Sequence, residues 1–398
     1  MTTKPFDVLI IGGGPAGATT GLLLAQAGWS VGIVEKKKFP RRKVCGEFMS
    51  ATNIALLQHI GLDDYYRFTS GPEIHRVGFY ADDLMLATDM PVSQQNYLKW
   101  GRALGREHLD TALLNKAAGL GAVVWQPARI EDIKRIDSLF SCSIILDNDH
   151  IETVSARIIV MANGSWEPLK NTTHRPSDLL GFKAHFINSN LAPDLMPLLA
   201  FPGGYGGMVH TDSGRVSLSC CIRRDVLQRI RKQYSGMQAG EAVIEYIKTK
   251  CLGVNNVLAS AQRVGNWLSC GPIQPGIRTG YGSGIFYVGN SAGEAHPIVA
   301  EGISMAMQSA WLLTDILIKN NLHLADDKEC DAAGRMYSRK WRSNFALRIY
   351  AAYFFAQCAM RPILLNLMIR SIKLFPSLLS VGARLSGKIK QVVPAEKI

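Results

Sequence analysis

The chain has 398 residues, of which 47% are hydrophobic and 19% are charged, a balance that supports a large buried core and excludes a disordered protein. Its net charge is +12, but the excess lies near the C-terminus, where residues 332–395 contain eleven Lys or Arg and no Asp or Glu. The remaining chain is close to neutral and no recognition motif accompanies the basic segment, so we expect no binding to nucleic acid.

The first elements form a βαβ unit. A β-branched run at 6–11 predicts a buried strand, an Ala- and Leu-rich stretch to Ala27 predicts a helix, and residues 30–34 predict a second strand that ends in Glu35. The intervening turn has the spacing of a dinucleotide fingerprint, with residues Gly12, Gly13, Gly14, Pro15, Ala16 and Gly17. Its glycines allow a pyrophosphate to approach the helix N-terminus. The Glu35 carboxylate suits a ribose diol and disfavours a 2′-phosphate, so we expect an unphosphorylated dinucleotide.

Helices and strands alternate through the rest of the chain. A basic loop at 36–48 is followed by predicted helices at 53–59 and 106–118. Predicted strands lie near 123–125, 130–136, 140–146 and 156–161. The segment 180–268 is strand-rich with one predicted helix near 239–249. A strand at 285–288 and a long helix at 303–318 precede basic amphipathic helices beyond residue 331.

The eight cysteines show no metal-ligand spacing and no Cys-x-x-Cys pair, so no metal site is expected. Cys220 and Cys221 are adjacent in a strand-like run and should point to opposite faces. Reduced thiols favour an intracellular protein. The N-terminal apolar run is short and ends in glycines, unlike a signal peptide, and no apolar stretch reaches the roughly 18 residues that cross a bilayer. We therefore expect a cytoplasmic protein.

Three separated motifs resemble one flavoprotein superfamily. "GREHLDTALL" (105–114) and "VGNSAGEAHPIVAEGISMA" (288–306) resemble the FAD-dependent oxidoreductases that include aromatic hydroxylases, halogenases and geranylgeranyl reductases. "RRKVCGEFMS" (41–50) is most similar to the geranylgeranyl-reductase branch. The resemblance covers residues 6–319 and implies FAD as the cofactor. The Trp-x-Trp-x-Ile-Pro signature of tryptophan halogenases is absent from the sequence, which argues against halogenation.

The resemblance also implies a fold of the p-hydroxybenzoate-hydroxylase type, in the α/β class. In this fold an FAD-binding Rossmann-like domain carries an inserted β-sheet substrate domain and is followed by C-terminal helices. We assign residues 1–73, 91–179 and 269–330 to a discontinuous FAD-binding domain. Residues 74–90 and 180–268 would form the substrate domain, and residues 331–398 a basic helical C-terminal segment.

Several cofactor contacts are carried over from the resembled family. Arg106 matches an arginine at a helix start that contacts the cofactor, although an arginine on a solvated helix face would look the same. Gly289-Asn290 stands where the family has Gly-Asp, whose carboxylate binds the ribityl chain. The amide of Asn290 can accept and donate, but the lost negative charge puts the flavin potential in doubt. Pro297 would lie against the flavin ring. Gly302 would let the backbone approach the pyrimidine edge, at the N-terminus of the following helix.

Three residues are catalytic candidates. Cys45 lies in the loop that approaches flavin and substrate in the resembled branch, where it either tunes the pocket or is a small buried apolar side chain. His296 is either a proton donor near the flavin or a loop histidine with a structural hydrogen bond. Tyr205 belongs to "FPGGYGG" (201–207), which resembles the substrate-pocket segment of the branch. Gly207 stands where the branch has tryptophan, so we expect a wider cavity.

The sequence leaves the reaction open. Only one dinucleotide fingerprint is present, and Asn163 in "ANGSWEP" (162–168) replaces an aspartate that relatives link to nicotinamide binding. NAD(P)H would therefore dock transiently, or another protein would supply the electrons. The first hypothesis is a reductase or dehydrogenase of an apolar, lipid-like substrate. The second is a monooxygenase of an aromatic or polyketide compound, and the third a flavin-binding assembly partner without turnover.

The basic C-terminal segment also has two interpretations. It could be an interfacial anchor attracted to anionic lipid on the inner face of a membrane. Alternatively, it could be a helical cap packed on the substrate domain, with its basic residues in solvent. A hydrophobic small molecule is the expected substrate in either case.

Overall fold

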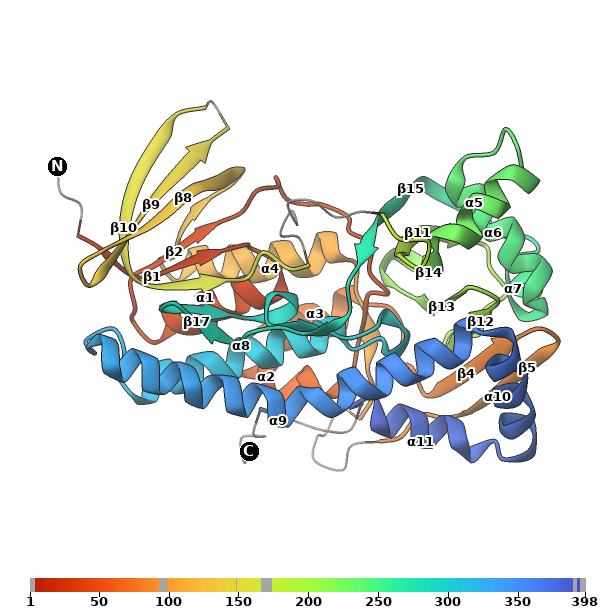
Figure 1. The fold of residues 1–398 in the computed structure, drawn as a ribbon. Coiled ribbons are helices and arrows are strands. Elements are labelled where there is room, and N and C mark those ends of the chain that lie inside the picture. The colour runs from red at the N-terminus through yellow and green to blue at the C-terminus, as the bar shows by residue number, and fades with distance from the viewer. Residues whose placement is uncertain (1–3, 93–98, 148, 166–173, 389–391, 394–398) are drawn as a thin grey trace.

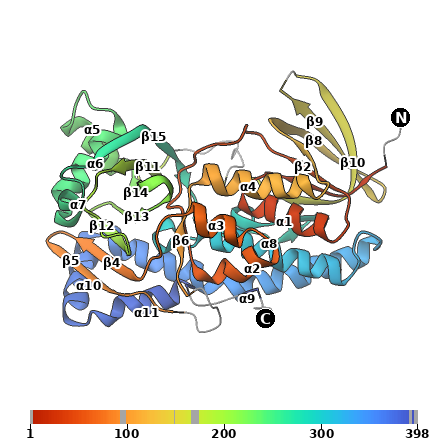
Figure 2. The same ribbon diagram turned by 180° about the vertical axis from the view of Figure 1, so that it is seen from behind.

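The computed structural model describes residues 4–92, 99–147, 149–165, 174–388 and 392–393. Two β-sheets lie side by side along the molecule, and the long helix α9 (Asp327–Met360) runs beneath both of them (Figure 1). The opposite view shows helices α1 (Pro15–Gln26), α2 (Ile54–His59), α3 (Asp63–Thr69) and α4 (Arg106–Gly119) between the first sheet and the middle of the molecule (Figure 2). This arrangement confirms the predicted fold class. The domain boundaries stay a prediction.

The first sheet has eight strands and contains the βαβ unit. Its main path is β17-β18-β10-β1-β2-β7, with β9 added to β10 and β8 to β9. The pairs β2–β7, β1–β2, β1–β10 and β10–β18 are parallel, so their carboxyl ends lie at one edge. The bounds are β1 Phe6–Ile11, β2 Val31–Val34, β7 Val123–Trp125, β8 Ala128–Ile136, β9 Leu139–Leu146, β10 Ile151–Met161, β17 Tyr281–Gly282 and β18 Ile285–Tyr287.

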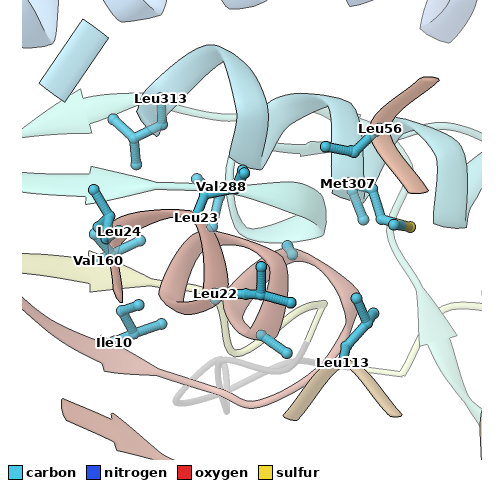
Figure 3. Packing of buried hydrophobic residues seen from close by; sticks show 14 of the residues in the cluster. Ile10, Leu22, Leu23, Leu24, Leu56, Leu113, Val160, Val288, Met307 and Leu313 are labelled. Carbon is cyan, nitrogen blue, oxygen red and sulfur yellow. The ribbon is translucent and has the colours of Figure 1, made fainter. Parts of the chain in front are cut away.

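An apolar core fixes the helices on this sheet. Helix α1 packs between the sheet, α4 and α8 (Gly302–Lys319). Figure 3 shows side chains from these elements converging, among them Leu22 of α1, Val160 of β10 and Leu313 of α8, all fully buried. Each such side chain contributes about 1.5–3 kcal/mol through burial. The core thereby fixes the edge where β1, β10 and β18 end.

The second sheet has seven strands in the order β15-β11-β14-β13-β12-β4-β5. Its bounds are β4 Arg76–Ala81, β5 Leu84–Asp89, β11 Leu179–Ile187, β12 Leu195–Phe201, β13 Gly204–His210, β14 Val216–Arg223 and β15 Gln262–Ile273. Cys220 and Cys221 face different apolar clusters on its two sides, as the alternation of a strand requires.

Three helices, rather than the single predicted one, cover one side of the second sheet. They are α5 (Arg224–Gln233), α6 (Ala239–Lys250) and α7 (Leu252–Val257). The prediction of one helix was wrong because α5 buries only Val226, Leu227 and Ile230 among charged residues, which left a weak apolar pattern. Helix α7 has six residues, too few for a helical period to stand out.

Short elements connect the two sheets. Strand β3 (Phe48–Met49) pairs with β6 (Arg102–Ala103), and β16 (Gly276–Ile277) pairs with β19 (Gly293–Glu294). The single-turn helices are η1 Ala51–Asn53, η2 Asp212–Gly214, η3 Gly289–Ser291 and η4 Pro297–Val299. Both β19 and η4 belong to the polar loop between β18 and α8.

The C-terminal helices pack on the free side of the second sheet. Helix α9 begins with a capping box formed by Asp326 and Glu329, and is followed by α10 (Pro362–Leu374) and α11 (Ser377–Leu385). Small residues of α9, including Ala352 and Ala356, share a buried cluster with Tyr205 and Val209 of β13. Among the described helices, no single one is long and apolar enough to cross a membrane; α9 and α10 pass that test only together, across a 104° bend.

Candidate functional site

The fingerprint turn has the geometry that a dinucleotide needs. Gly12 has a φ of +109°, and a Cβ there would lie 2.5 Å from the Ala162 carbonyl oxygen. At Gly14 a Cβ would meet only Nη2 of Arg106, at 3.7 Å. The space before the N-terminus of α1 is therefore open and faces a guanidinium, as an anion site requires.

Three cations gather at this space. Arg106 is buried and forms a bidentate ion pair with Asp110 through two 2.7 Å hydrogen bonds. Burial opposes its charge, yet the Asp110 carboxylate holds the pKa of Arg106 above its usual range. Arg41 lies 3.6 Å from the same carboxylate. Burial and the two neighbouring arginines lower the pKa of Lys43. The Asp110 carboxylate opposes part of this lowering, so Lys43 lies in the field of the same three charged side chains.

The N-terminus of α4 is held in place by the second sheet. The Asp212 carboxylate accepts a 2.7 Å hydrogen bond from the Gly105 amide, and Arg215 bridges Asp212 and Glu107. His108 lies 3.3 Å from the same Asp212 carboxylate. These contacts fix the first turn of α4 and therefore the position of Arg106. The interpretation of Arg106 as a solvated surface arginine does not fit its burial.

Glu35 is oriented by two backbone amides. Its Oε2 accepts from the amide of Gly13 and its Oε1 accepts from that of Lys37, both at 2.8 Å. Each carboxylate oxygen keeps a further lone pair for a ribose hydroxyl. Nε of the neighbouring Arg41 is buried without a hydrogen-bond partner among the described residues. The nucleotide end of the site therefore offers an acceptor for a ribose and an unused donor for a phosphate.

Asn290 lies at the same edge, beyond β18, and is bonded to a buried acid. Its Nδ2 donates to Oγ of Ser165 at 3.0 Å and to Oε1 of Glu294 at 3.1 Å, so its Oδ1 can still accept. Burial raises the pKa of Glu294. A carboxyl group therefore lies next to position 290, on Glu294, although burial disfavours its charged form. Sequence reasoning gave this residue no role, although it lies within the quoted loop.

Pro297 and Gly302 stand out in the polar loop. Within residues 291–310, all of which are described, they alone are exposed. A Cβ on Gly302 would meet nothing within 4 Å. The backbone at the start of α8 therefore borders open space, and the partial positive charge of the helix N-terminus points toward it. This is where the sequence predicted the flavin ring and its pyrimidine edge.

Tyr205 and His296 are brought together from β13 and the polar loop. The Tyr205 hydroxyl lies 2.9 Å from Nδ1 of His296, and both side chains are buried. Burial lowers the pKa of His296 from 6.5 to about 4 and raises that of Tyr205 well above its usual value. The pair is therefore uncharged at neutral pH. The ring of Tyr353 from α9, with 54% of its surface exposed, lies 5.6 Å from that of His296.

Cys45 occupies a different part of the site. Its sulfur accepts a 3.4 Å hydrogen bond from the Glu47 amide, and its thiol interacts with the Arg106 guanidinium. The structure thus places Cys45 beside the predicted phosphate contact. Its polar contacts are with these residues, whereas Tyr205 and His296 contact each other.

The Cys45 loop is anchored to the second sheet by a buried ionic cluster that sequence reasoning missed. Glu47 has a φ of +65° and bonds Lys183 and His185 of β11, with all three side chains fully buried. Arg42 donates to Nδ1 of His185, so Nε2 carries the proton donated to Glu47. These contacts hold the pKa of Glu47 well below its usual range despite burial. Because Glu47 has a left-handed backbone conformation and its side chain is held by buried partners, the Cys45 loop is fixed in one conformation.

Two further predictions concern neighbouring residues. Asn163 accepts a hydrogen bond from Ser291, beside the Gly289-Asn290 turn, while residues 166–168 of the same motif lie outside the described residues. At Gly207 a Cβ would meet only the Pro197 carbonyl oxygen, at 3.4 Å. The strand therefore has room on the side that carries Tyr205. The width of a cavity here stays a prediction.

The described residues fit FAD along the whole edge. The anion space at α1, the three cations and the oriented Glu35 suit the ADP half. The open backbone at Pro297 and Gly302 and the free acceptor of Asn290 suit the flavin half. The fingerprint turn, Glu35 and Asn290 follow strands β1, β2 and β18 of one sheet, and they were predicted from the sequence, whereas Arg41 and Lys43 were not.

Comparisons with known proteins agree with this geometry. A family model described as an FAD binding domain matches residues 5–214. The digeranylgeranylglycerophospholipid reductase 2 of Methanopyrus kandleri is 24% identical over 361 residues, which cover 85% of this chain and 83% of that protein.

Solved structures extend the likeness to the whole fold. A geranylgeranyl bacteriochlorophyll reductase-like protein from Thermoplasma acidophilum superposes with a TM-score of 0.70 at 19% identity, covering 99% of this chain and 92% of that one. A myxobacterial chondrochloren halogenase gives a TM-score of 0.74 at 20% identity, covering 100% and 94%. At these identities the structures show a shared fold. The family match spans more than half of the chain, which therefore belongs to the FAD binding domain family and is an FAD-dependent oxidoreductase.

Proposed function

We propose that the protein reduces or dehydrogenates an apolar, lipid-like substrate. The observation that carries this proposal is the buried, uncharged Tyr205–His296 pair beside Pro297. Saturating a carbon–carbon double bond requires a hydride on one carbon and a proton on the other. Bound FAD supplies the hydride, with its electrons drawn from NAD(P)H docking transiently or from a partner protein. The Tyr205–His296 pair holds the exchangeable proton.

The surroundings of the pair suit an apolar substrate. Tyr205, Gly207 and Val209 alternate along β13 and share one face. Ile298 and Val299 of η4 join the same buried cluster, as do the alanines of α9. An apolar chain could lie here without leaving polar groups unpaired. The name of the Methanopyrus kandleri relative, a reductase of a polyprenyl phospholipid, supports the same substrate class.

Solvent deuterium tests this role for the pair. Turnover of an unsaturated polyprenyl lipid in D2O should place solvent deuterium on the carbon that the pair protonates. The other carbon also gains deuterium to the extent that N5–H of the reduced flavin exchanges with solvent before hydride transfer. Tyr205→Phe, which keeps the ring but removes the hydroxyl, should slow turnover by about 10²-fold or more while FAD stays bound. Tyr246→Phe is the matched control, because it removes a hydroxyl that bonds the Pro202 carbonyl on the other side of the second sheet. Full activity of Tyr205→Phe would contradict the proposal that the Tyr205–His296 pair holds the exchangeable proton. Oxygen consumed in proportion to product would instead identify a monooxygenase.

We also propose peripheral contact with an anionic membrane. Helix α10 has two apolar faces: Leu365, Ile369 and Ile372 are buried, while its opposite face is exposed. Exposed apolar side chains also lie on α9 and α11. We propose that together they form the C-terminal apolar face, made of Leu347, Tyr350, Phe354, Ile363, Leu367, Leu374, Phe375 and Leu378. An exposed apolar surface of this kind commonly binds a partner or a membrane.

Charge supports an anionic membrane as the partner. Arg370 lies on the exposed face of α10, and residues 332–395 contain no acidic residue that would repel anionic lipid. The helices also contact the second sheet, so the segment is a packed cap as well as a candidate anchor. Co-sedimentation with anionic but not neutral vesicles is expected, and Arg361→Glu with Arg370→Glu should weaken it. Equal binding to both vesicle types, or to neither, would reject membrane contact.

A further inference from the structure

A buried chain of polar side chains links the C-terminal segment to the start of α8. Lys388, just beyond α11, donates to Oε1 of Glu301 at 3.1 Å and to the Val299 carbonyl at 3.0 Å. Glu301 is fully buried, and its Oε2 accepts from Ser50 at 3.1 Å. The pair therefore ties the end of the chain to the residue that immediately precedes Gly302.

The chain continues across the loop behind the Cys45 segment. Ser50 contacts Thr52 at 2.8 Å, and Gln308 of α8 donates to Thr52 at 2.9 Å. Arg348 of α9 then donates to Oε1 of Gln308 at 3.2 Å. Each of these side chains is at most 6% exposed. The network begins and ends in the C-terminal segment, so that segment completes it.

The network places two cationic side chains and one carboxylate beneath the N-terminus of α8. Glu301 carries one negative charge, whereas Lys388 and Arg348 carry two positive charges. Burial lowers the pKa of Arg348 and the Glu301 carboxylate offsets part of that effect, so these two charges interact. The helix dipole adds further positive potential at the same point. A negative charge developing near Gly302 would be stabilised by the Lys388 and Arg348 side chains and by the helix dipole.

We propose that docking of the C-terminal segment sets the redox potential of the bound FAD, with Lys388 as the positioning residue that acts through Glu301. The inference rests on the proposed placement of the flavin at Pro297 and Gly302. With Lys388 in place, the charge of Glu301 is neutralised and α8 presents its N-terminus to the flavin. Without Lys388, the buried Glu301 carboxylate would lose its lysine partner one residue from Gly302, and its charge would disfavour electrons on the flavin.

Opposite single-charge changes test the proposal by redox titration of the purified holoprotein. Lys388→Met should lower the midpoint potential of bound FAD, because it exposes the flavin to the Glu301 charge. Glu301→Gln, which keeps an acceptor for Ser50, should raise the potential, because the Glu301 charge then no longer offsets the charge of Lys388. Each change should alter the equilibrium constant against a reference dye by about fivefold or more. The double variant should return close to the wild-type value.

Arg384→Met is the matched control, since it removes the same charge from an exposed position four residues before Lys388. Its potential should be unchanged. Hydrogen exchange of α11 provides a second readout and should increase in Lys388→Met but not in Arg384→Met. Shifts of equal sign in Lys388→Met and Glu301→Gln, or no shift while FAD remains bound, would overturn the proposal. Because these measurements need no substrate, they stand even if the proposed reductase activity fails.

Discussion

Replacing Asn290 by Asp probes the charge beside the ribityl position. Nδ2 of Asn290 lies 3.1 Å from Oε1 of Glu294, so the substitution brings two carboxylates into contact. Two unit charges about 4 Å apart repel by about 4 kcal/mol at an effective dielectric constant of 20. Burial already raises the pKa of Glu294, so Glu294 should take up the proton that relieves this repulsion. Near neutral pH the pair therefore carries one charge, as the wild type does when Glu294 is ionised.

This protonation makes the flavin potential of Asn290→Asp depend on pH. The potential should stay close to wild type around neutral pH and fall as the shared proton is lost at higher pH. The fall should correspond to on the order of 1 kcal/mol, the effect of one added negative charge in a partly buried site. Redox titration of the holoprotein at a series of pH values measures this directly.

Glu294→Gln isolates the contribution of the pair. In the double variant Asn290→Asp/Glu294→Gln no second carboxylate shares the proton, so the pH-dependent fall should disappear. A potential in Asn290→Asp that drops equally at every pH would refute the coupling. Loss of FAD from that variant would refute the placement of Asn290 at the ribityl chain.

Three further outcomes are expected from single substitutions. Gly14→Val should abolish FAD binding without unfolding the protein, because its side chain enters the open space before Arg106; retained yellow colour after gel filtration would contradict this. His296→Gln should flatten the acid limb of the stability curve. The pKa of His296 in the folded protein, about 4, lies below the usual 6.5. The wild type should therefore lose about 3 kcal/mol of unfolding free energy as the pH falls from 6.5 to 4, which chemical denaturation would measure. The pKa of His185 is also lowered, so the wild type and His296→Gln share a further loss of stability at low pH. If stability falls equally steeply with pH in both proteins, His296 is not buried in its neutral form. Glu47→Gln should destabilise the protein by about 3–5 kcal/mol, since it leaves the Lys183 charge buried without its carboxylate, and a smaller loss in denaturant unfolding would show that this cluster is not needed for folding.

Local patterns were sufficient to predict the βαβ unit and most of the first sheet. The fingerprint turn needs specific glycines at specific positions, and a strand at 123–125 or a helix from Arg106 follows from residues close in the chain. Asp110 could have been recognised by the same reasoning, because residues four apart on a helix face each other. Helix α5 was missed because its charges conceal a narrow apolar stripe.

Contacts between distant residues could not be predicted from the sequence. Tyr205 and His296 are 91 positions apart, and Lys388 and Glu301 are 87 apart. No periodicity connects such pairs, since they meet only when the second sheet and the C-terminal helices pack against the first domain. The sequence also allowed the C-terminal segment to be either a cap or an anchor. The structure shows that it packs as a cap while leaving a second apolar face exposed.

The most direct test of the proposed reaction is anaerobic reduction of the purified holoprotein, followed by reoxidation with candidate acceptors in the presence and absence of oxygen. We expect an unsaturated polyprenyl lipid to reoxidise the flavin without oxygen, with one double bond lost for each flavin oxidised. Reoxidation that requires oxygen, with an oxygenated product, would contradict the account and identify a monooxygenase. A flavin that no donor reduces would contradict it as well and identify a flavin-binding protein without turnover.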